Sequence, residues 1–388
     1  MTKRAAIIVL DGLGIGPAPD TAAYGDAGSD TLGNVARAVG GLTLPNLEKL
    51  GLGKDRPIAG LSATIRPTAA HGIAQPASAG KDSTTGHWEI CGVLLKKAFR
   101  TYPKGFPVAL LDAFAQRTGR GWLGNKAASG TAILDELGAE HQRTGKWIVY
   151  TSADSVFQVA AHEATVPLAE LYHACALARE MLIGEDAVSR VIARPFVGSA
   201  GDYRRTPNRK DFSIAPTGTT LLDRMADAGV PRVGIGKVDD LFAGRNISSE
   251  HTPTNGDAYR LIEHALETLD GGFVFVNVIE FDQTWGHRND VPGFHEGLKE
   301  LDAWLPRLFS RLRPDDLVML TADHGNDPTT PSTDHSRELV PLLVVGPNVK
   351  PVALGMRRTF ADLGQTVADY FGLPALAAGT SFLRDVTA

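Results

Sequence analysis

The sequence has little cysteine, no long apolar run and no excess of one charge. Of its 388 residues only Cys91 and Cys175 are cysteine, and neither has a metal-binding spacing, which favours reduced, packed thiols and a cytoplasmic location. The apolar stretches are too short to cross a bilayer, so we expect no membrane association. The formal net charge of -5 comes without a basic stripe, so nucleic acid is not an expected partner.

What the sequence does have is a series of apolar runs of strand length. The buried strands that we expect cover residues 6–10, 273–281, 317–320 and 339–345. Uninterrupted apolar runs suit a parallel sheet that is covered on both faces. Helical patterns alternate with these runs, which predicts an α/β fold with a mostly parallel sheet. One expected helix, 295–312, carries a leucine stripe for the core and a kink at Pro306.

Acidic and histidine side chains stand at the ends of these strands. In open α/β sheets ligands bind at the carboxyl ends of the strands. A single acid next to a histidine is more simply a capped turn. Several such groups without basic partners would repel one another, and proteins usually neutralise such a cluster with bound divalent cations. The repeated pattern therefore predicts a metal site. The candidate ligands are Asp11, Asp282, His287, Asp323, His324 and His335.

A cluster of hydroxyls follows Lys81 and Asp82 and enters an expected helix. An isolated cluster of this kind is usually an N-cap. A helix N-terminus also offers free N–H groups and the positive end of the helix dipole, so a hydroxyl there is suited to carrying a phosphoryl group, with Lys81 nearby to offset charge. The candidates are Ser83, Thr84 and Thr85.

The character of the sequence changes between residues 101 and 216. Its first residues are rich in proline and glycine, and a basic loop lies at its end. The alternation of strand and helix resumes only after this loop. We therefore expect a core domain made of residues 1–100 and 217–388, with an inserted α+β domain at 101–216. Arginines gather near the end of the insert. Such residues are typical of a solvated surface, but facing a metal cleft they would bind a phosphate.

With these residues in place, the chain resembles the phosphopentomutases of the alkaline phosphatase superfamily from end to end. The matching stretches are GKD (80–82), GHWE (86–89), YTSADS (150–155), RPFVG (194–198), RTPNR (205–209), TADHGND (321–327) and TDH (333–335). The resemblance implies a core of alkaline-phosphatase type with the insert as a cap over the site. It also implies interconversion of ribose 1-phosphate and ribose 5-phosphate, and of the 2-deoxyribose pair.

The same resemblance implies a mechanism on two Mn²⁺ ions. A phosphorylated enzyme would meet the pentose phosphate and pass through a sugar bisphosphate, and a sugar 1,5- or 1,6-bisphosphate would be the activator. The family's phosphorylated hydroxyl directly follows Lys-Asp and is usually threonine. Here that residue is Ser83, with Thr84 and Thr85 as alternatives.

Ligands and substrate contacts follow from the resemblance as well. One ion would be held by the nucleophile with Asp11, Asp323 and His324, and the second by Asp282, His287 and His335. The implied sugar-phosphate contacts are Ser152, Asp154, Arg190, Arg194 and Lys237.

Other functions stay open at this point. A related two-metal enzyme, such as a phosphoglycerate mutase or a phosphomonoesterase, would use the same ligands. A non-catalytic protein that binds metal or a sugar phosphate would also use them, but a hydroxyl after Lys81 and Asp82 has no role in a storage site. The sequence leaves the oligomeric state open, and a monomer is compatible with it.

Overall fold

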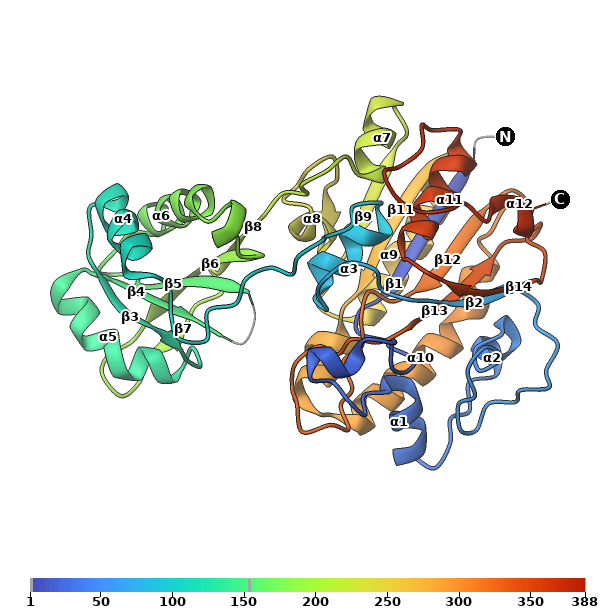
Figure 1. Cartoon of the computed structure of the whole chain (residues 1–388), viewed down its shortest axis with the longest axis horizontal. Coiled ribbons are helices and arrows are strands. Elements are labelled where there is room, and N and C mark those ends of the chain that lie inside the picture. The colour runs from blue at the N-terminus through green and yellow to red at the C-terminus, as the bar shows by residue number, and fades with distance from the viewer. Residues whose placement is uncertain (1–2, 153–154, 388) are drawn as a thin grey trace. The chain divides into compact units, whose positions relative to one another are not determined.

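The computed structural model describes residues 3–152 and 155–387, which form two compact units. Unit 1 combines Met1–Ala98 with Pro216–Ala388, and unit 2 is the continuous segment Phe99–Ala215 (Figure 1). The chain therefore leaves unit 1 once and returns to it once. These boundaries lie close to those expected for the insert, 101–216.

Unit 1 is built on an eight-stranded sheet with the order β10-β9-β11-β1-β12-β13-β2-β14. Its strands are β1 (Arg4–Leu10), β2 (Ala70–Ala74), β9 (Arg232–Ile235), β10 (Ser249–Glu250), β11 (Gly272–Val278), β12 (Leu317–Thr321), β13 (Val340–Val345) and β14 (Ala353–Arg357). Pairing is parallel from β10 to β12 and between β2 and β14, whereas β13 pairs antiparallel with both of its neighbours. Among the described strands of this sheet β13 alone runs against the others, which confirms the mostly parallel sheet.

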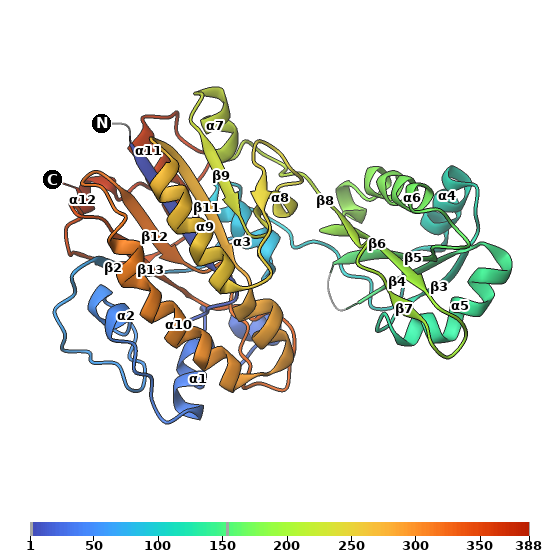
Figure 2. The same ribbon diagram turned by 180° about the vertical axis from the view of Figure 1, so that it is seen from behind.

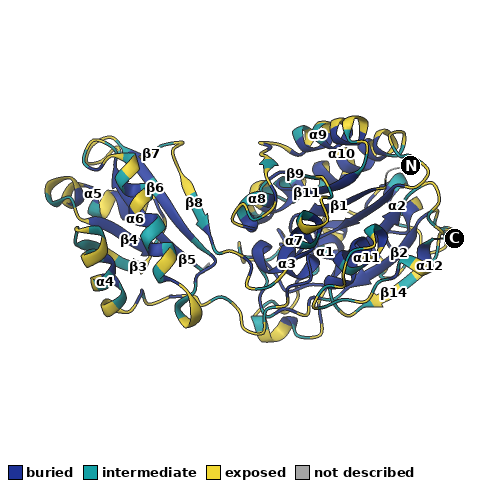
Figure 3. Cartoon of the chain, turned by 90° about the horizontal axis from the view of Figure 1, so that it is seen from above, coloured by how far each residue is buried: buried dark blue, intermediate teal, exposed yellow. Residues whose placement is uncertain are grey.

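Helices cover both faces of this sheet. Figure 1 shows α3 and α11 in front of it, and Figure 2, from behind, shows α9 and α10 on the opposite face. The helices of unit 1 are α1 (Thr31–Ala38), α2 (Pro45–Leu50), α3 (Ser83–Ile90), α7 (Leu221–Asp227), α8 (Val238–Leu241), α9 (Asn255–Thr268), α10 (Val291–Phe309), α11 (Ala361–Phe371) and α12 (Leu383–Val386), with short turns η1 (Thr21–Tyr24), η3 (Phe281–Trp285) and η4 (Gly286–Arg288). Strands β1 and β11 are buried over their whole length (Figure 3), and so is β12, as a doubly covered sheet requires. Within the part of the chain that is described, none of the helices has the length and apolar character to cross a membrane.

The strand expected at 273–281 ends earlier than its apolar run. Strand β11 stops at Val278, and the chain then turns into the π-helix η3. The reason is a reciprocal pair of hydrogen bonds from a distant helix: Asn255 N donates to Glu280 Oε2 at 2.6 Å, and Glu280 N donates to Asn255 Oδ1 at 3.0 Å. Glu280 is thereby held outside the strand ladder.

The helix expected at 295–312 begins a turn earlier, as α10. Asp290 is its N-cap, and its side chain accepts a hydrogen bond from Gly293 N at 2.9 Å. This capping satisfies a free N–H group of the first turn. The helix continues through Pro306 and ends at Phe309, so the expected end at residue 312 was three residues too late.

Unit 2 holds a second, mixed sheet with the order β3-β4-β5-β6-β7, in which β8 also pairs with β6. Its elements are α4 (Val108–Thr118), β3 (Trp122–Ala127), α5 (Ala132–Thr144), β4 (Trp147–Thr151), β5 (Val156–His162), α6 (Leu168–Met181), η2 (Gly184–Asp186), β6 (Arg190–Val197), β7 (Arg204–Arg205) and β8 (Lys210–Ser213). Successive residues of β4 point to opposite faces. Trp147 and Val149 join the core under α4 and α6, while Ile148 and Tyr150 join the core under α5.

One buried histidine of unit 2, His141, has both ring nitrogens engaged by the backbone. His141 Nδ1 lies 2.6 Å from Lys146 O, and His141 Nε2 accepts a hydrogen bond from His162 N at 2.8 Å. This pattern requires a neutral ring, because protonation would place a hydrogen on Nε2 and remove the acceptor. Burial lowers the pKa of His141, although the hydrogen bond to Lys146 acts in the opposite direction.

We expect acid to destabilise unit 2 through His141. Because the folded-state pKa is lowered, the neutral ring contributes its full stability above its ordinary pKa of 6.5, and the contribution falls as the pH drops below that value. Hydrogen exchange of the β5 amides between about pH 7.5 and about pH 5 measures this. His141→Gln keeps an acceptor but does not titrate, so its exchange should depend less on pH; equal dependence in both proteins would contradict the assignment.

Candidate metal centre

The candidate ligands meet at one edge of the unit 1 sheet. Asp11 follows β1, Asp323 and His324 follow β12, and β11 leads through η3 to Asp282. His335 instead precedes a strand, β13. Because β13 runs opposite to its neighbour β12, its beginning lies at the edge where the other strands end. A single edge therefore collects side chains from four strands.

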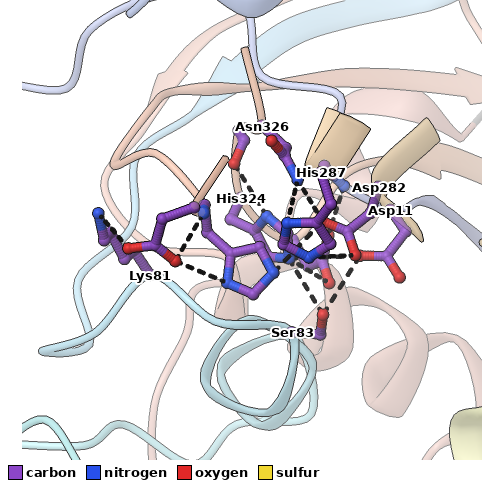
Figure 4. A network of polar contacts seen from close by, with 12 residues as sticks. Asp11, Lys81, Ser83, Asp282, His287, His324 and Asn326 are labelled. Atoms are coloured by element: carbon purple, nitrogen blue, oxygen red, sulfur yellow. Dashed lines mark hydrogen bonds and ion pairs between the residues drawn. The ribbon is translucent and has the colours of Figure 1, made fainter. Parts of the chain in front are cut away.

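Among the candidate ligands, two groups of three side chains have ligand atoms within 4.8 Å of one another (Figure 4). One group is Asp282, His287 and His335, and the other is Asp11, Asp282 and His324. Asp282 belongs to both: its Oδ1 lies 3.3 Å from His335 Nε2, and its Oδ2 lies 3.3 Å from His287 Nε2. All are buried except His287, which is half-buried.

Backbone carbonyls orient two of these histidines. His287 Nδ1 lies 2.7 Å from Thr333 O, and His324 Nδ1 lies 3.0 Å from Gly325 O. An imidazole that donates from Nδ1 to a carbonyl presents Nε2 on its other side, which is the usual arrangement of histidines that bind metal.

The charge of the buried carboxylates acts strongly on His324. Burial lowers the pKa of this histidine, but Asp323, Asp11 and Asp282 outweigh burial and raise it to about 10. The ring is therefore protonated at neutral pH when no cation is bound. Metal ligation requires the neutral imidazole, so a divalent cation binding at His324 displaces that proton.

A lysine lies against the ligands, so the expected lack of basic partners is wrong. Lys237 Nζ is 2.7 Å from Asp11 Oδ2. Burial alone would raise the pKa of Asp11, but Lys237 and His324 hold it below its ordinary value. Burial lowers the pKa of Lys237, and Asp11 and Asp282 reverse the effect and raise it. Lys237, a candidate for sugar-phosphate binding, thus stands beside the first ligand.

Asp323 lies next to the second group rather than within it. Its Oδ1 accepts a hydrogen bond from Gly12 N at 3.2 Å. Its Oδ2 is buried without a hydrogen-bond partner among the described residues, although His87 Nδ1 is 3.1 Å and His324 Nε2 is 3.5 Å away. A buried carboxylate oxygen with unmet bonding capacity, among imidazole and carboxylate donors, fits a bound divalent cation.

Two of the three hydroxyls at the start of α3, those of Ser83 and Thr85, have different surroundings. Ser83 Oγ lies 3.3 Å from Asp11 Oδ1 and 3.1 Å from His324 Nε2. Asp82 is the N-cap and accepts from Thr85 N at 3.1 Å and from Thr85 Oγ1 at 2.6 Å. The Thr85 hydroxyl is therefore used in capping, whereas the Ser83 hydroxyl faces the candidate ligands.

A glycine permits the close approach of α3 to the loop after β12. A Cβ at Gly86 would lie 2.4 Å from Asp323 O and 2.6 Å from Asp323 Cβ. Any larger side chain would push the helix away from the loop. Gly86 therefore sets the distance between the Ser83 hydroxyl and the candidate ligands.

Two further residues of the site were not predicted. His87 is fully buried, and its Nδ1 lies 2.9 Å from Ser83 O as well as beside Asp323. Asn326 Nδ2 donates to Asp282 Oδ1 at 2.7 Å. His87 could have been found from its spacing, because a residue four positions after Ser83 lies on the same helix face.

Lys81 takes part in a salt bridge rather than pointing at Ser83. Its Nζ lies 2.8 Å from Asp26 Oδ1 and 3.1 Å from Asp334 Oδ2. Burial lowers the pKa of Lys81, but these two acids raise it above its ordinary value. The lysine thus links the segment before α3 to the segment that carries His335.

The remaining candidates belong to unit 2. They are Ser152, Arg190 and Arg194, while Asp154 lies outside the described residues. Arg194 Nε donates to Gln158 Oε1 at 3.0 Å. Burial, together with the like charges of Arg209 and Arg205, lowers the pKa of Arg194 to about 10. Asp211 already offsets part of the positive charge nearby, since its Oδ2 lies 2.6 Å from Arg209 Nη2 and 3.5 Å from Arg190 Nη1.

Comparison with known proteins gives close relatives over the whole chain. A family model of the metalloenzyme superfamily matches residues 3–375. The phosphopentomutase of Anaeromyxobacter sp. (strain K) is 57% identical and covers 100% of both chains. That of Carboxydothermus hydrogenoformans is 54% identical and covers 99% of each. The structure of Leishmania mexicana phosphoglycerate mutase at low cobalt concentration is 14% identical, with a TM-score of 0.50 over 98% of this chain and 97% of its own, and it shows the fold alone.

We expect Asp282 to matter for both cations. Asp282→Asn should weaken binding at both groups by at least about tenfold, whereas His287→Ala should weaken one. Calorimetric titration of Mn²⁺ into chelator-treated protein measures the two affinities. Asp55→Asn is the matched control, because Asp55 pairs with His71 at 2.7 Å outside both groups. A single weakened site in Asp282→Asn would show that this carboxylate serves one ion.

Proposed function

The chain belongs to the phosphopentomutases of the metalloenzyme superfamily, and we propose that it interconverts ribose 1-phosphate and ribose 5-phosphate, and the 2-deoxyribose pair, through a phosphorylated Ser83. The observation that carries this proposal is the position of Ser83 Oγ. It lies beside Asp11 and His324, at the N-terminus of α3, where free N–H groups favour a phosphoryl group.

Ser83 acts as the group that receives and returns phosphate. Phosphorylated Ser83 first gives its phosphoryl group to the free hydroxyl of the pentose phosphate: the bond from phosphorus to Oγ breaks as the bond to the sugar oxygen forms, and the hydroxyl loses its proton. Ser83 Oγ then bonds to the other phosphorus of the bisphosphate as the bond from that phosphorus to the sugar oxygen breaks, and the freed sugar oxygen takes up a proton. The intermediate is a sugar bisphosphate, and a sugar 1,5- or 1,6-bisphosphate primes the enzyme. His87 supports the same turn through its contact with Ser83 O.

Two Mn²⁺ ions suit the donor set of imidazole nitrogen and carboxylate oxygen. Asp282, His287 and His335 would hold one, and Asp11, Asp282 and His324, with Asp323 beside them, would hold the other. When bound, such ions lower the pKa of a hydroxyl and neutralise charge on a transferring phosphoryl group. The side chains orient Ser83 and keep the ligands in place.

Lys237 lies beside Asp11 and is the proposed sugar-phosphate contact of unit 1. Within unit 2, Ser152, Arg190 and Arg194 are the proposed anion-binding side chains. The depressed pKa of Arg194, caused by burial and by neighbouring arginines, supports binding of an anion there. A cytoplasmic location is also part of the proposal, supported by the two cysteines of the sequence, which are buried and unpaired.

The assay of the activity follows both possible products. Chain loaded with Mn²⁺ and incubated with ribose 1-phosphate should yield ribose 5-phosphate with little inorganic phosphate, because the phosphoryl group returns to the sugar. Predominant release of inorganic phosphate would indicate a phosphomonoesterase. Turnover of phosphoglycerate instead would indicate the related mutase, and no turnover with no phosphoprotein would indicate a binding protein.

Ser83→Ala should abolish labelling of the protein by a radioactive sugar bisphosphate, because Ser83 Oγ is the hydroxyl that contacts His324 and Asp11, whereas the Thr85 hydroxyl bonds to Asp82. Intact mass and peptide mapping locate the label. Thr84→Ala is the matched control and should retain it. Phosphate recovered on Thr84 or Thr85 of the unmodified chain would refute the assignment.

A further inference from the structure

We propose that Arg337 is a positioning residue. It fixes the loop that leads into Ser83, residues 75–82, and thereby sets the distance between the Ser83 hydroxyl and the candidate metal ligands. The inference rests on the proposed role of Ser83. Arg337 has a side chain only 4% exposed. It stands two residues after His335, so one short segment carries both a candidate ligand and the group that holds the loop of the nucleophile.

The guanidinium of Arg337 uses all five of its N–H donors. Nη1 donates to Ser78 O and to Gly80 O, each at 2.6 Å. Nη2 donates to Pro76 O at 3.0 Å and to Asp20 Oδ2 at 3.0 Å, and Nε donates to Asp20 Oδ1 at 3.1 Å. Three carbonyls of one loop therefore converge on a single cation, which Asp20 holds from the other side.

The segment around Tyr24 completes the arrangement. The guanidinium of Arg337 lies 4.7 Å from the centre of the Tyr24 ring, and the Tyr24 hydroxyl accepts a hydrogen bond from Gly80 N at 3.2 Å. Arg337 N donates to Asp26 Oδ2 at 2.8 Å, and Asp26 Oδ1 pairs with Lys81. Gly80 is thus held through its N–H and its carbonyl, and the next residue through its side chain.

The loop has little freedom where it enters α3. Gly80 has a φ of +139°, and a Cβ there would lie 2.8 Å from Thr85 Oγ1, so the backbone passes tightly against the first turn. Ser83 Oγ is 3.1 Å from His324 Nε2, and a shift of about 1 Å would break that contact. Lysine offers three donors from one nitrogen and cannot replace the fork of Arg337.

The test is Arg337→Lys in the full chain loaded with Mn²⁺. The rate of phosphoryl transfer from a radioactive hexose 1,6-bisphosphate to the protein should fall about 10- to 100-fold. The affinity for Mn²⁺, measured by titration, should stay within about twofold, because the variant displaces only the neutral hydroxyl and leaves the carboxylate and imidazole ligands in place. An unchanged transfer rate, or equal losses of transfer and of Mn²⁺ affinity, would overturn the proposal.

Arg357→Lys is the matched control. Arg357 also pairs with an acid, Asp362, at 2.7 Å, and lies 5.5 Å from the centre of the Phe382 ring. Its side chain bonds to neither the loop nor the candidate ligands; only its backbone carbonyl, which the substitution retains, accepts from Gln75 N at the start of the loop. Its replacement should leave both the transfer rate and the Mn²⁺ affinity unchanged. Slower phosphoryl transfer in this variant would mean that replacing any acid-paired arginine of unit 1 by lysine slows the reaction. That result would overturn the assignment to Arg337.

Tyr24→Phe decides the question if Arg337→Lys does not fold. It removes the acceptor for Gly80 N and keeps the ring under Arg337, so transfer should slow with Mn²⁺ affinity unchanged; an unaltered rate would refute the proposal. Failure of the proposed function is seen separately, because the unmodified chain would then carry no label on Ser83.

Discussion

The constraint on which the structure depends is the burial of three carboxylates, Asp11, Asp282 and Asp323, at one edge of a sheet. If these charges were not compensated, burying them would cost more free energy than the few kcal/mol by which a folded domain is stable. His324 and Lys237, whose pKa values the buried carboxylates raise, supply positive charge, and divalent cations complete the balance in the working enzyme. Every strand that carries a ligand must therefore reach the same edge, and the strand order of unit 1 serves that requirement.

Local pattern was enough to predict part of this arrangement. An apolar run that stops at an acid predicts both a buried strand and the placement of the acid at its carboxyl end, as at Asp11 and Asp323. The direction of β13 could not be predicted, since an apolar run has the same composition in either direction. Yet that direction brings His335 to the others. The early end of β11 was not predicted either, because the hydrogen bonds that cause it come from Asn255, in a different element.

The contacts that tie the site together depend on strand order and not on local sequence. Lys237 follows β9, and it reaches Asp11 because β9 pairs with β11 and β11 with β1. No pattern near residue 237 indicates this. Arg337 donates hydrogen bonds to carbonyls of a loop more than 250 residues earlier in the chain. Its contacts therefore could not be predicted from the sequence either. Sequence analysis thus identified residues by their chemistry, and the fold determined which of them meet.

The division of the chain into an interrupted and a continuous unit has a consequence for biosynthesis. Both neighbours of β1 in the sheet, β11 and β12, leave the ribosome more than 250 residues after it. Unit 2 is continuous, so its strands have all their partners once residue 215 has emerged. The first part of unit 1, residues 1–98, must wait through this interval with an unpaired apolar strand, which exposes it to aggregation during translation.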